Sequence, residues 1–270
     1  TAGLADAVRE LTVVNAANSR HLDAYHEFLY ARLQRKGVDR EDAHKLANRD
    51  RHVFAALMLA HGHGDGLVTG ATRKNAPVLA QLGHVFDLRP QDGAVGITAV
   101  LHKGRIVLIG DTLVHEWPEA EDLADIATRG AGVARGLGLE PRVAFLSFSN
   151  FGYPVSERAV KMAKATEVLD RRGVDFEYEG EMTVDVALNM DSAARYPFSR
   201  LTGPANVLVV PARHSASISV KLMQEMAGAT VIGPILTGVP QPIQICSTTS
   251  TVNDILNMAA ISAGGLGTGR

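Results

Sequence analysis

The second half of the sequence repeats one pattern three times, and this repetition constrains the fold more than any other feature. In each repeat a short apolar run precedes a polar turn, and an amphipathic helical segment follows. The apolar runs are VAFL at 143–146, NVLVV at 206–210 and PIQIC at 242–246. Strands that alternate with helices in this way form parallel sheets with crossover helices. The pattern therefore predicts an α/β fold with mainly parallel strands.

The first half of the sequence predicts mostly helices, followed by a hairpin. The segment 19–37 begins with a cap residue, has apolar positions at helical spacing and ends at a glycine, which favours a helix. The run at 93–112 predicts two strands joined at 102–104. Pro118 stands at the favoured first position of a helix, with acidic residues after it. Further segments predict helices from Asp39 and around 53–60, a short strand within 64–70 and a helix over about 75–85.

Each of the three repeats has a polar turn, and these turns are the first candidates for a binding site. They are SFSN at 147–150, RHS at 213–215 and STTST at 247–251. Because ligands of open α/β sheets gather at the carboxyl ends of strands, we expect the turns to converge on one cleft. Hydroxyls at a helix N-terminus, where N–H groups are unpaired, favour a phosphorylated ligand. The alternative, that one hydroxyl of 247–251 simply caps the last helix, stays open.

The composition argues against several classes of protein. The net charge is −2, from 27 basic and 29 acidic residues, which gives no electrostatic reason to expect nucleic acid or a membrane surface as a partner. A single cysteine, Cys246, rules out an internal disulfide framework and fits a reducing, cytoplasmic location. Apolar runs such as 53–60 are too short to span a bilayer, and the start lacks a signal-peptide pattern. The absence of an initiator methionine and the glycine-rich end indicate a piece of a longer protein.

Two other groups of reactive side chains have simpler interpretations. His61 and His63 lie beside Asp65, but no further strong ligand has a spacing suited to zinc, so we expect a glycine-rich turn and no metal site. Cys246 ends an apolar strand, where a thiol is usually inert packing. The phosphate-binding motifs GxGxxG and Walker A are absent. Taken alone, the residues predict a two-domain α/β protein that binds a ligand.

Seven motifs in order extend this prediction, because together they resemble the phosphate acetyl/butyryltransferase family from about Asn15 to Ala263. The motifs are GDGLVTGA at 64–71, the DT–P–AEDLADIA pattern at 111–127, SFSNFG at 147–152, EGEMTVDVALN at 179–189, LTGPANVLVVP at 201–211, RHSASISVKLMQ at 213–224 and GPILTGVPQPIQI at 233–245.

The resemblance implies a two-domain fold like that of isocitrate and isopropylmalate dehydrogenases, with a cleft between the domains. One domain would combine residues 1–95 with 236–270, and the other would be the inserted segment 96–235. The family moves an acetyl group between coenzyme A and phosphate, using an adjacent Ser-Arg pair and an Asp. These align with Ser247, Thr248 and Asp254, so a threonine stands where the family has an arginine.

The loss of this arginine makes acetyl transfer doubtful. A second expected arginine falls on Ala80, and Arg73 and Arg213 are the candidates to replace the missing charges. A guanidinium is always charged and donates two hydrogen bonds to phosphate, whereas a threonine hydroxyl is one neutral donor.

One branch of the family is more similar still, through SNFG at 149–152, DVALN at 185–189 and VNDILNMAA at 252–260. It is the C-terminal phosphate acetyltransferase-like domain of bacterial NADP-dependent malic enzymes. That resemblance implies a regulatory domain that binds acetyl-CoA, inhibits the decarboxylation of malate to pyruvate in the preceding domains, and assembles as a homodimer or larger oligomer. NADP and a divalent metal would belong to those preceding domains, and this domain would hold no cofactor, metal or catalytic residue.

The candidate contacts of acetyl-CoA are the polar residues of the three turns and the aspartate after them. They are Ser147, Ser149, Asn150, Arg213, His214, Ser215, Ser247, Thr248, Thr249, Ser250 and Asp254, with Asn206 and Lys221 as weaker candidates. Strand-end and helix-cap roles are the alternative for each of them. For the whole chain, two rival functions stay open: an active phosphate acetyltransferase, and a dimerisation scaffold with an empty cleft.

Overall fold

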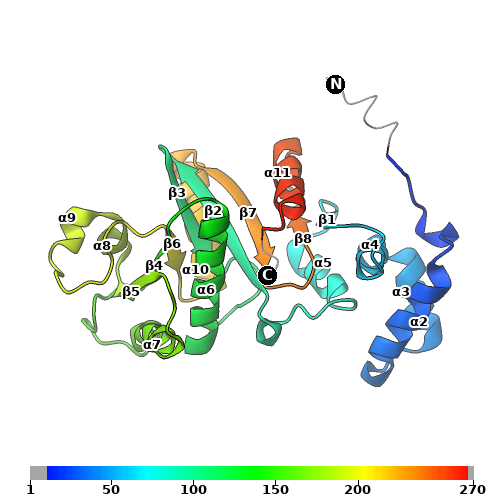
Figure 1. Ribbon diagram of the computed structural model, residues 1–270, viewed down its shortest axis with the longest axis horizontal. Coiled ribbons are helices and arrows are strands. Elements are labelled where there is room, and N and C mark those ends of the chain that lie inside the picture. Colours follow the sequence, from blue (N-terminus) through cyan, green and yellow to red (C-terminus); the bar gives the residue numbers. More distant parts are fainter. Residues whose placement is uncertain (1–10, 267–270) are drawn as a thin grey trace.

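The computed structural model describes residues 11–266, and Figure 1 shows helices at one end of the molecule and a large sheet toward the other. None of the helices within these residues has the length and apolar content needed to cross a membrane. The α-helices are α2 (Leu22–Leu33), α3 (Arg40–Arg49), α4 (Arg51–Ala60), α5 (Asn75–Leu82), α6 (Ala120–Gly136), α7 (Glu157–Arg172), α8 (Val184–Leu188), α9 (Met190–Ala193), α10 (Arg213–Ala227) and α11 (Val252–Ala263). The strands are β1 (Leu67–Gly70), β2 (Val95–His102), β3 (Arg105–Gly110), β4 (Arg142–Leu146), β5 (Glu177–Met182), β6 (Val207–Val209), β7 (Thr230–Thr237) and β8 (Ile243–Cys246).

The strands form two sheets. The larger one has the order β5-β4-β6-β3-β2-β7, and β1 pairs with β8 in the smaller one. Neighbours from β5 to β3 are parallel, as are β1 and β8. Strand β2 pairs antiparallel with both β3 and β7, so it runs against the other five strands. These pairings confirm the expected α/β fold with mainly parallel strands.

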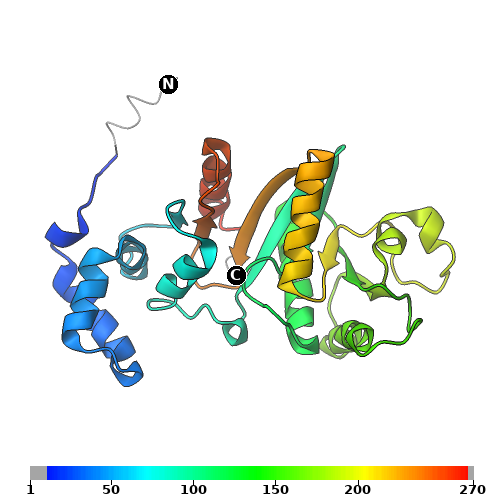
Figure 2. The same ribbon diagram turned by 180° about the vertical axis from the view of Figure 1, so that it is seen from behind.

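Helices cover both faces of the larger sheet. Figure 1 shows α6 in front of it, and the reverse view in Figure 2 shows α10 on the opposite face. Strand β6 explains this arrangement, because side chains alternate between the faces of a strand. Val207 and Val209 belong to the apolar core shared with α6 and α7, whereas Leu208 and Val210 belong to the core shared with α8 and α10. A strand buried on both faces reads as a continuous apolar run, as this one does.

A third apolar core holds the N-terminal helices against the smaller sheet. It combines Tyr25 of α2 and Leu57 of α4 with Ile243 and Ile245 of β8. Strands β1 and β8 approach closely where they end, since a Cβ at Gly70 would lie 2.2 Å from the carbonyl oxygen of Cys246. Gly70 also has φ +102°, a conformation open mainly to glycine. The turn at 247–251, which follows β8, therefore lies beside the loop that follows β1.

Most of the expected elements are present, and their differences from the sequence prediction lie at the boundaries of helices, since the helix expected over 75–85 ends at Leu82. The helix expected at Pro118 begins two residues later at Ala120, where Glu119 is the N-cap. The backbone N–H of Glu119 donates to Asp122 at 2.8 Å, and this contact fixes the start of the helix. Residues 213–215, expected as a turn, form the first turn of α10. The hairpin at 102–104 is confirmed by the pairing of His102 with Arg105.

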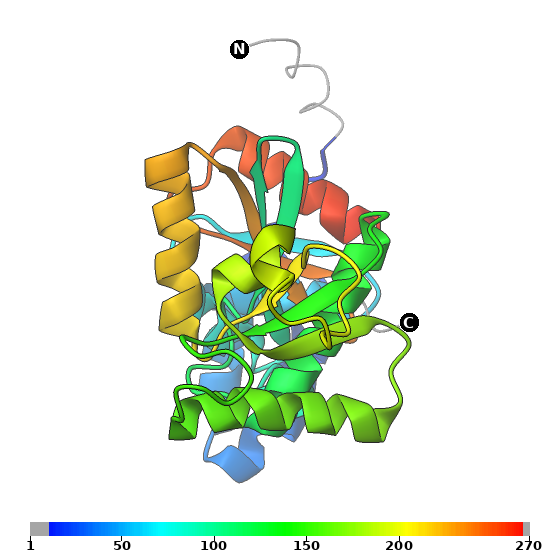
Figure 3. The ribbon, with the colours of Figure 1, turned by 90° about the vertical axis from the view of Figure 1, so that its left-hand side faces the viewer.

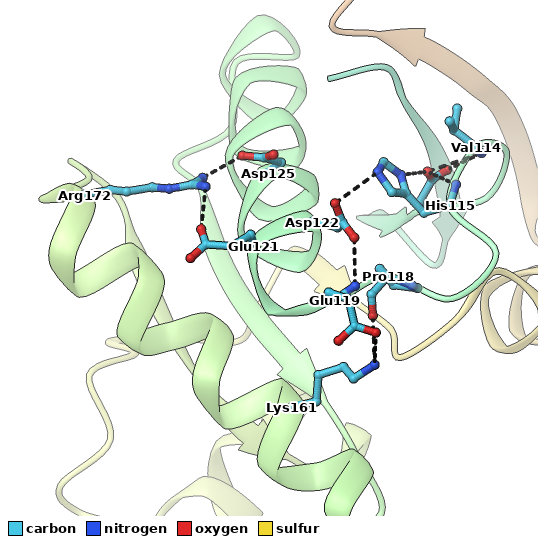
Figure 4. Close-up of polar contacts among 10 residues, drawn as sticks. Val114, His115, Pro118, Glu119, Glu121, Asp122, Asp125, Lys161 and Arg172 are labelled. Atoms are coloured by element: carbon cyan, nitrogen blue, oxygen red, sulfur yellow. Dashed lines mark hydrogen bonds and ion pairs between the residues drawn. The ribbon is translucent and has the colours of Figure 1, made fainter. Parts of the chain in front are cut away.

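The buried carboxylate of Asp111 organises the connection between β3 and α6. It accepts hydrogen bonds from the backbone N–H of Gly96 in β2 at 3.0 Å and from that of Leu113 at 2.6 Å. Further bonds come from the backbone N–H of Val114 and from both the backbone N–H and the ring Nδ1 of His115. On its other side the His115 ring faces Asp122, with Nε2 4.0 Å from the carboxylate, as Figure 4 shows. One side chain thus fixes the loop to the sheet.

We expect Asp111→Asn to lower the free energy of unfolding by about 3 kcal/mol or more, because several donors would face an amide that accepts poorly and carries no charge. Urea denaturation at neutral pH measures this change. Asp175→Asn is the matched control, since the Asp175 side chain is 80% exposed and pairs with Arg135 at the surface. Equal stability of the two variants would contradict the role given to Asp111.

Candidate functional site

A hollow of about 420 Å³ lies beside the turn that follows β8. We call it the hydroxyl-turn pocket. Hydroxyls dominate its lining next to that turn, while α10, β7 and the loop before α5 supply the other walls. The lining residues are Lys74, Asn75, Thr98, Thr112, Ser217, Val220, Lys221, Gln224, Val231, Ile232, Gly233, Pro234, Ile245, Cys246, Ser247, Thr248, Thr249, Ser250, Asp254 and Met258.

The five hydroxyl residues of the turn divide into two roles. Thr251 caps α11, because its Oγ1 accepts from the backbone N–H of Asp254 at 3.2 Å. The Asp254 carboxylate in turn accepts from the backbone N–H and the hydroxyl of Thr251, at 2.7 and 2.9 Å. The alternative that stayed open, a helix cap, therefore holds for one of the five hydroxyl residues, Thr251. Ser247, Thr248, Thr249 and Ser250 line the pocket instead.

The charges of the hydroxyl-turn pocket are two lysines and one aspartate. Lys74 and Lys221 contribute ammonium groups, and Asp254 is the carboxylate among the lining residues. No arginine is among those residues, and Thr248 is neutral. A pocket with this lining can bind an anion through mobile ammonium groups and hydroxyls, but it offers no fixed bidentate donor.

The two arginines considered as replacements are held elsewhere. Arg73 forms an ion pair with Asp50 at 2.9 Å. Arg213 donates to the carbonyl oxygen of Leu113 at 3.2 Å and lies 3.4 Å from Glu116. Neither of them lines the hydroxyl-turn pocket.

A second hollow, of about 660 Å³, lies at the ends of β4 and β6. We call it the strand-end pocket. Its lining combines apolar side chains with the hydroxyl groups of three serines and one threonine. Helix α7 adds two cationic side chains. The lining residues are Trp117, Pro118, Leu146, Ser147, Phe148, Arg158, Lys161, Met162, Thr183, Val184, Val210, Pro211, Ala212, His214, Ser215 and Ser219.

The three polar turns do not line one cleft, so that expectation is wrong. Ser147, His214 and Ser215 line the strand-end pocket, whereas residues 247–250 line the hydroxyl-turn pocket. Helix α10 contributes to both, since its residues at 214, 215 and 219 face one hollow and those at 217, 221 and 224 face the other. Residues 213–215 form the start of α10. The body of this helix lies between them and the turn at 247–250.

Four further candidates have local hydrogen-bonding roles and line neither pocket. Ser149 is fully buried and donates to Glu181 at 2.9 Å. The side-chain oxygen of Asn150 accepts from the backbone N–H of Thr183 at 2.8 Å. Asn206 joins two backbone segments, accepting from Arg142 and donating to Glu140. Together with Arg213, these residues have contacts that the fold itself explains, and their contact with acetyl-CoA stays a prediction.

The histidines near the start of β1 take part in packing. The Tyr25 hydroxyl and His63 Nδ1 share a hydrogen bond of 2.6 Å, and His61 Nδ1 bonds the Leu57 carbonyl oxygen at 2.8 Å. Within residues 11–266, no group of three or more His, Cys, Asp or Glu side chains is arranged to hold a metal ion.

Several lining residues of the hydroxyl-turn pocket were not found from the sequence. Thr98 of β2 and Thr112 after β3 share a hydrogen bond of 2.8 Å, although they are far from 247–251 in the chain. Lys74 and Asn75, at the start of α5, lie just beyond the GDGLVTGA motif. The position of Lys74 next to a family motif was an available signal, whereas the two threonines are brought to the pocket by sheet pairing alone.

Comparisons with known proteins agree with this architecture. The family described as Phosphate acetyl/butaryl transferase matches residues 2–263. The NADP-dependent malic enzyme of Rhizobium meliloti is 50% identical over 258 residues, covering 96% of this chain and 34% of that protein. The phosphate acetyltransferase of Thermoanaerobacterium thermosaccharolyticum is 32% identical over 265 residues, covering 95% of this chain and 80% of that protein. The crystal structure of a phosphotransacetylase from Streptococcus pyogenes matches with a TM-score of 0.86 and 28% identity, covering 95% of this chain and 79% of that one.

We expect Cys246, which also lines the hydroxyl-turn pocket, to react slowly with iodoacetamide. Burial, and secondarily the charge of Asp254, raises the pKa of its thiol, so less thiolate is present near neutral pH. Because Cys246 is the sole cysteine, mass spectrometry of the whole chain measures its alkylation directly. The rate at pH 8 should be severalfold lower in the folded chain than in urea, and should rise with pH only at more alkaline values. Equal rates in both states would contradict a buried, protonated thiol.

Proposed function

Because this chain belongs to the phosphate acetyl/butaryl transferase family, we propose that it binds acetyl-CoA in the hydroxyl-turn pocket and serves as a regulatory domain of a bacterial NADP-dependent malic enzyme. The observation that carries the proposal is a pocket whose hydroxyls and lysines match a phosphorylated ligand, with Thr248 where the resemblance expects a catalytic arginine.

The lining of the pocket supports binding of a CoA thioester. Lys74 and Lys221 can pair with phosphate oxygens, and the hydroxyls of Ser247 and Thr249 can donate to a phosphate or a thioester carbonyl. Ser247 and Thr249 already contact each other, with 3.1 Å between their hydroxyl oxygens. Apolar side chains such as Met258 and Ile232 would cover the alkyl part of the ligand.

The same lining argues against rapid acetyl transfer. Charge develops on oxygen during attack at a thioester, and fixed donors accelerate that step by stabilising the transition state more than the bound substrate. Removal of one such donor typically costs about a hundredfold to a thousandfold in rate. With Thr248 neutral, and Arg73 and Arg213 bound to other carboxylates, the pocket would retain recognition without turnover.

The regulatory role rests on the malic enzyme relatives. The chain spans about a third of the length of the malic enzyme it matches, 34% in the Rhizobium meliloti protein. We propose that the remaining part carries malate decarboxylation together with its NADP and divalent metal, and that acetyl-CoA bound to this domain inhibits that reaction. A homodimer or larger oligomer would give the assembly the two states that allosteric control requires.

The separate apolar cores support the proposed division into two domains. Leu236, Val239 and the residues of β8 share the core of the N-terminal helices, whereas the segment 95–235 supplies nearly all of the two cores around the larger sheet. The hydroxyl-turn pocket draws Ser247 from the first proposed domain, 1–95 with 236–270, and Lys221 from the second, 96–235. Ligand contacts to both would favour one relative arrangement of the domains and so couple binding to shape.

An active phosphate acetyltransferase is the second candidate function. It is favoured by the relative of that name, of which this chain covers 80%, and by the presence of Ser247 and Asp254 at the positions that the resemblance assigns to catalysis. Lys74 and Lys221 would then have to supply the charge that an arginine gives in the family.

Calorimetry and an enzyme assay distinguish the two functions. We expect acetyl-CoA to bind the chain with a saturable heat signal, and we expect no acetyl phosphate above background when inorganic phosphate is added. Robust formation of acetyl phosphate would contradict the regulatory proposal and favour the transferase. Absence of binding at millimolar acetyl-CoA would contradict both functions and support a scaffold with an empty pocket.

We expect Lys221→Ala to weaken acetyl-CoA binding by about tenfold, because a charge-assisted bond to phosphate would be lost. Lys221 is exposed on α10, so the fold should be unaffected. Lys45→Ala is the matched control, since Lys45 lies on α3, pairs with Glu41 and lines neither pocket. Isothermal titration of both variants measures the difference, and equal affinities would place the ligand away from the hydroxyl-turn pocket.

A further inference from the structure

The strand-end pocket lies at a point of the larger sheet where two neighbouring parallel strands, β4 and β6, send their helices to opposite faces. Strand β4 leads to α7, whose Met162 and Leu169 join the core on the α6 side. The adjacent strand β6 leads to α10, whose Val220 joins the core on the other side. Figure 3 shows α10, in orange, and α7, in green, along different sides of this part of the chain. Such a switch point opens a crevice at the carboxyl ends of the strands, which is where open α/β sheets bind ligands.

The charges on the lining of this crevice favour an anion. Arg158 and Lys161 of α7 both line it, and none of its lining residues is a carboxylate. Within residues 11–266, Arg158 has no carboxylate partner, and its guanidinium lies over the Trp117 ring at 5.6 Å. Lys161 is partly neutralised by Glu119, 2.8 Å away. The pocket therefore carries a positive charge that nothing in the described part of the chain compensates.

The rim of the pocket presents aromatic rings that the fold leaves open. Trp117 is 57% exposed and Phe148 is 64% exposed, although both are large apolar side chains. Trp117 meets the ring of His214 edge-on, with centroids 4.8 Å apart. Exposed rings beside a cation are suited to a ligand with a planar base, because stacking on an aromatic face is favourable for every nucleobase.

The loop that carries Trp117 is tied to neighbouring elements on two sides. Lys161 donates to the carbonyl oxygen of Pro118 at 3.4 Å as well as to Glu119, which ties α7 to the loop that carries Trp117. Figure 4 shows these contacts next to His115 and Asp122, which anchor the same loop from the other side. A binding surface that is already ordered loses little conformational entropy on association.

We propose that the strand-end pocket is a second, independent ligand site that binds a nucleotide, with the base against Trp117 and Phe148 and the phosphate at Arg158 and Lys161. The hydroxyls of Ser147 and Ser215 and the ring of His214, which the sequence assigns to acetyl-CoA, line this second site. Its volume of about 660 Å³ lies within the range of small-molecule pockets. The site is separate from the acetyl-CoA site proposed above, because α10 stands between the two hollows.

Trp117 is itself the probe for this site, because it is the sole tryptophan of the chain. The difference in tryptophan emission between the wild type and Trp117→Phe isolates its signal, in this chain or in a longer protein that contains it. We expect ADP to quench that signal saturably. Inorganic phosphate at equal concentration should leave it unchanged, because phosphate has no base to stack. Absence of saturable quenching by ADP, or equal quenching by phosphate, would overturn the proposal.

Charge variants on one helix test the phosphate contact. Arg158→Gln should raise the dissociation constant of ADP by about tenfold or more, as expected for loss of a charge-assisted bond. Lys164→Gln removes a charge from an exposed position of the same helix that does not line the pocket, and should leave the constant unchanged. Equal effects of the two variants would overturn the proposal. Equilibrium dialysis with ADP confirms the constants without relying on fluorescence.

A cross-test separates this site from the hydroxyl-turn pocket. Lys221→Ala should leave the dissociation constant of ADP unchanged, because Lys221 lines only the hydroxyl-turn pocket. Loss of ADP binding in Lys221→Ala would mean that ADP uses the hydroxyl-turn pocket and would overturn the independent site. If acetyl-CoA fails to bind at all while ADP quenches Trp117, the acetyl-CoA proposal fails and the nucleotide site stands.

Discussion

The buried carboxylate of Asp111 is the contact on which the arrangement of both pockets depends. It collects hydrogen bonds from Gly96 in β2 and from three successive residues of the following loop, Leu113 to His115. A buried carboxylate is costly unless donors surround it, so the loop has few alternative conformations. The loop then carries Trp117 and Pro118 to the rim of the strand-end pocket. At its start lies Thr112, which bonds Thr98 in the lining of the hydroxyl-turn pocket.

Helix α10 converts this fixed framework into two separate hollows. It is separated from the end of β6 by three residues, packs Ala216 and Val220 onto the sheet and presents its two flanks to the two different pockets. One flank carries Ser217 and Lys221 toward the hydroxyl turn, and the other carries His214 and Ser215 toward Trp117. The same helix therefore borders both proposed ligand sites. Residues on both flanks belong to one rigid helix. A ligand in one pocket would therefore change the other pocket only if it moved the whole of α10.

The proposed distinction between binding and catalysis in this chain rests on a few charged side chains. Thr248 and Ala80 occupy positions where the resemblance expects arginines, and the nearby guanidiniums of Arg73 and Arg213 are paired with Asp50 and Glu116. The lysines that line the hydroxyl-turn pocket can attract phosphate, since an ammonium is a point charge on a flexible stem. Transition-state stabilisation requires donors held in one geometry, which a flexible stem does not give without further contacts. Under the proposed function, the pocket would bind its ligand without holding donors in that geometry.

The sequence by itself determined the class of fold and most of the helices and strands. Alternation of apolar runs with amphipathic segments depends on local spacing, and β6 reads as an apolar run because both of its faces are buried. The sequence also located the hydroxyl turn, the capping role within it and the family to which the chain belongs. Only the tertiary structure decided which polar residues share a pocket. Ser147 and Ser247 follow strands of different sheets, Thr98 and Thr112 meet through antiparallel pairing, and Ser149 is buried against Glu181. Such contacts join residues far apart in the chain, so they depend on strand order and helix placement, which local patterns do not encode.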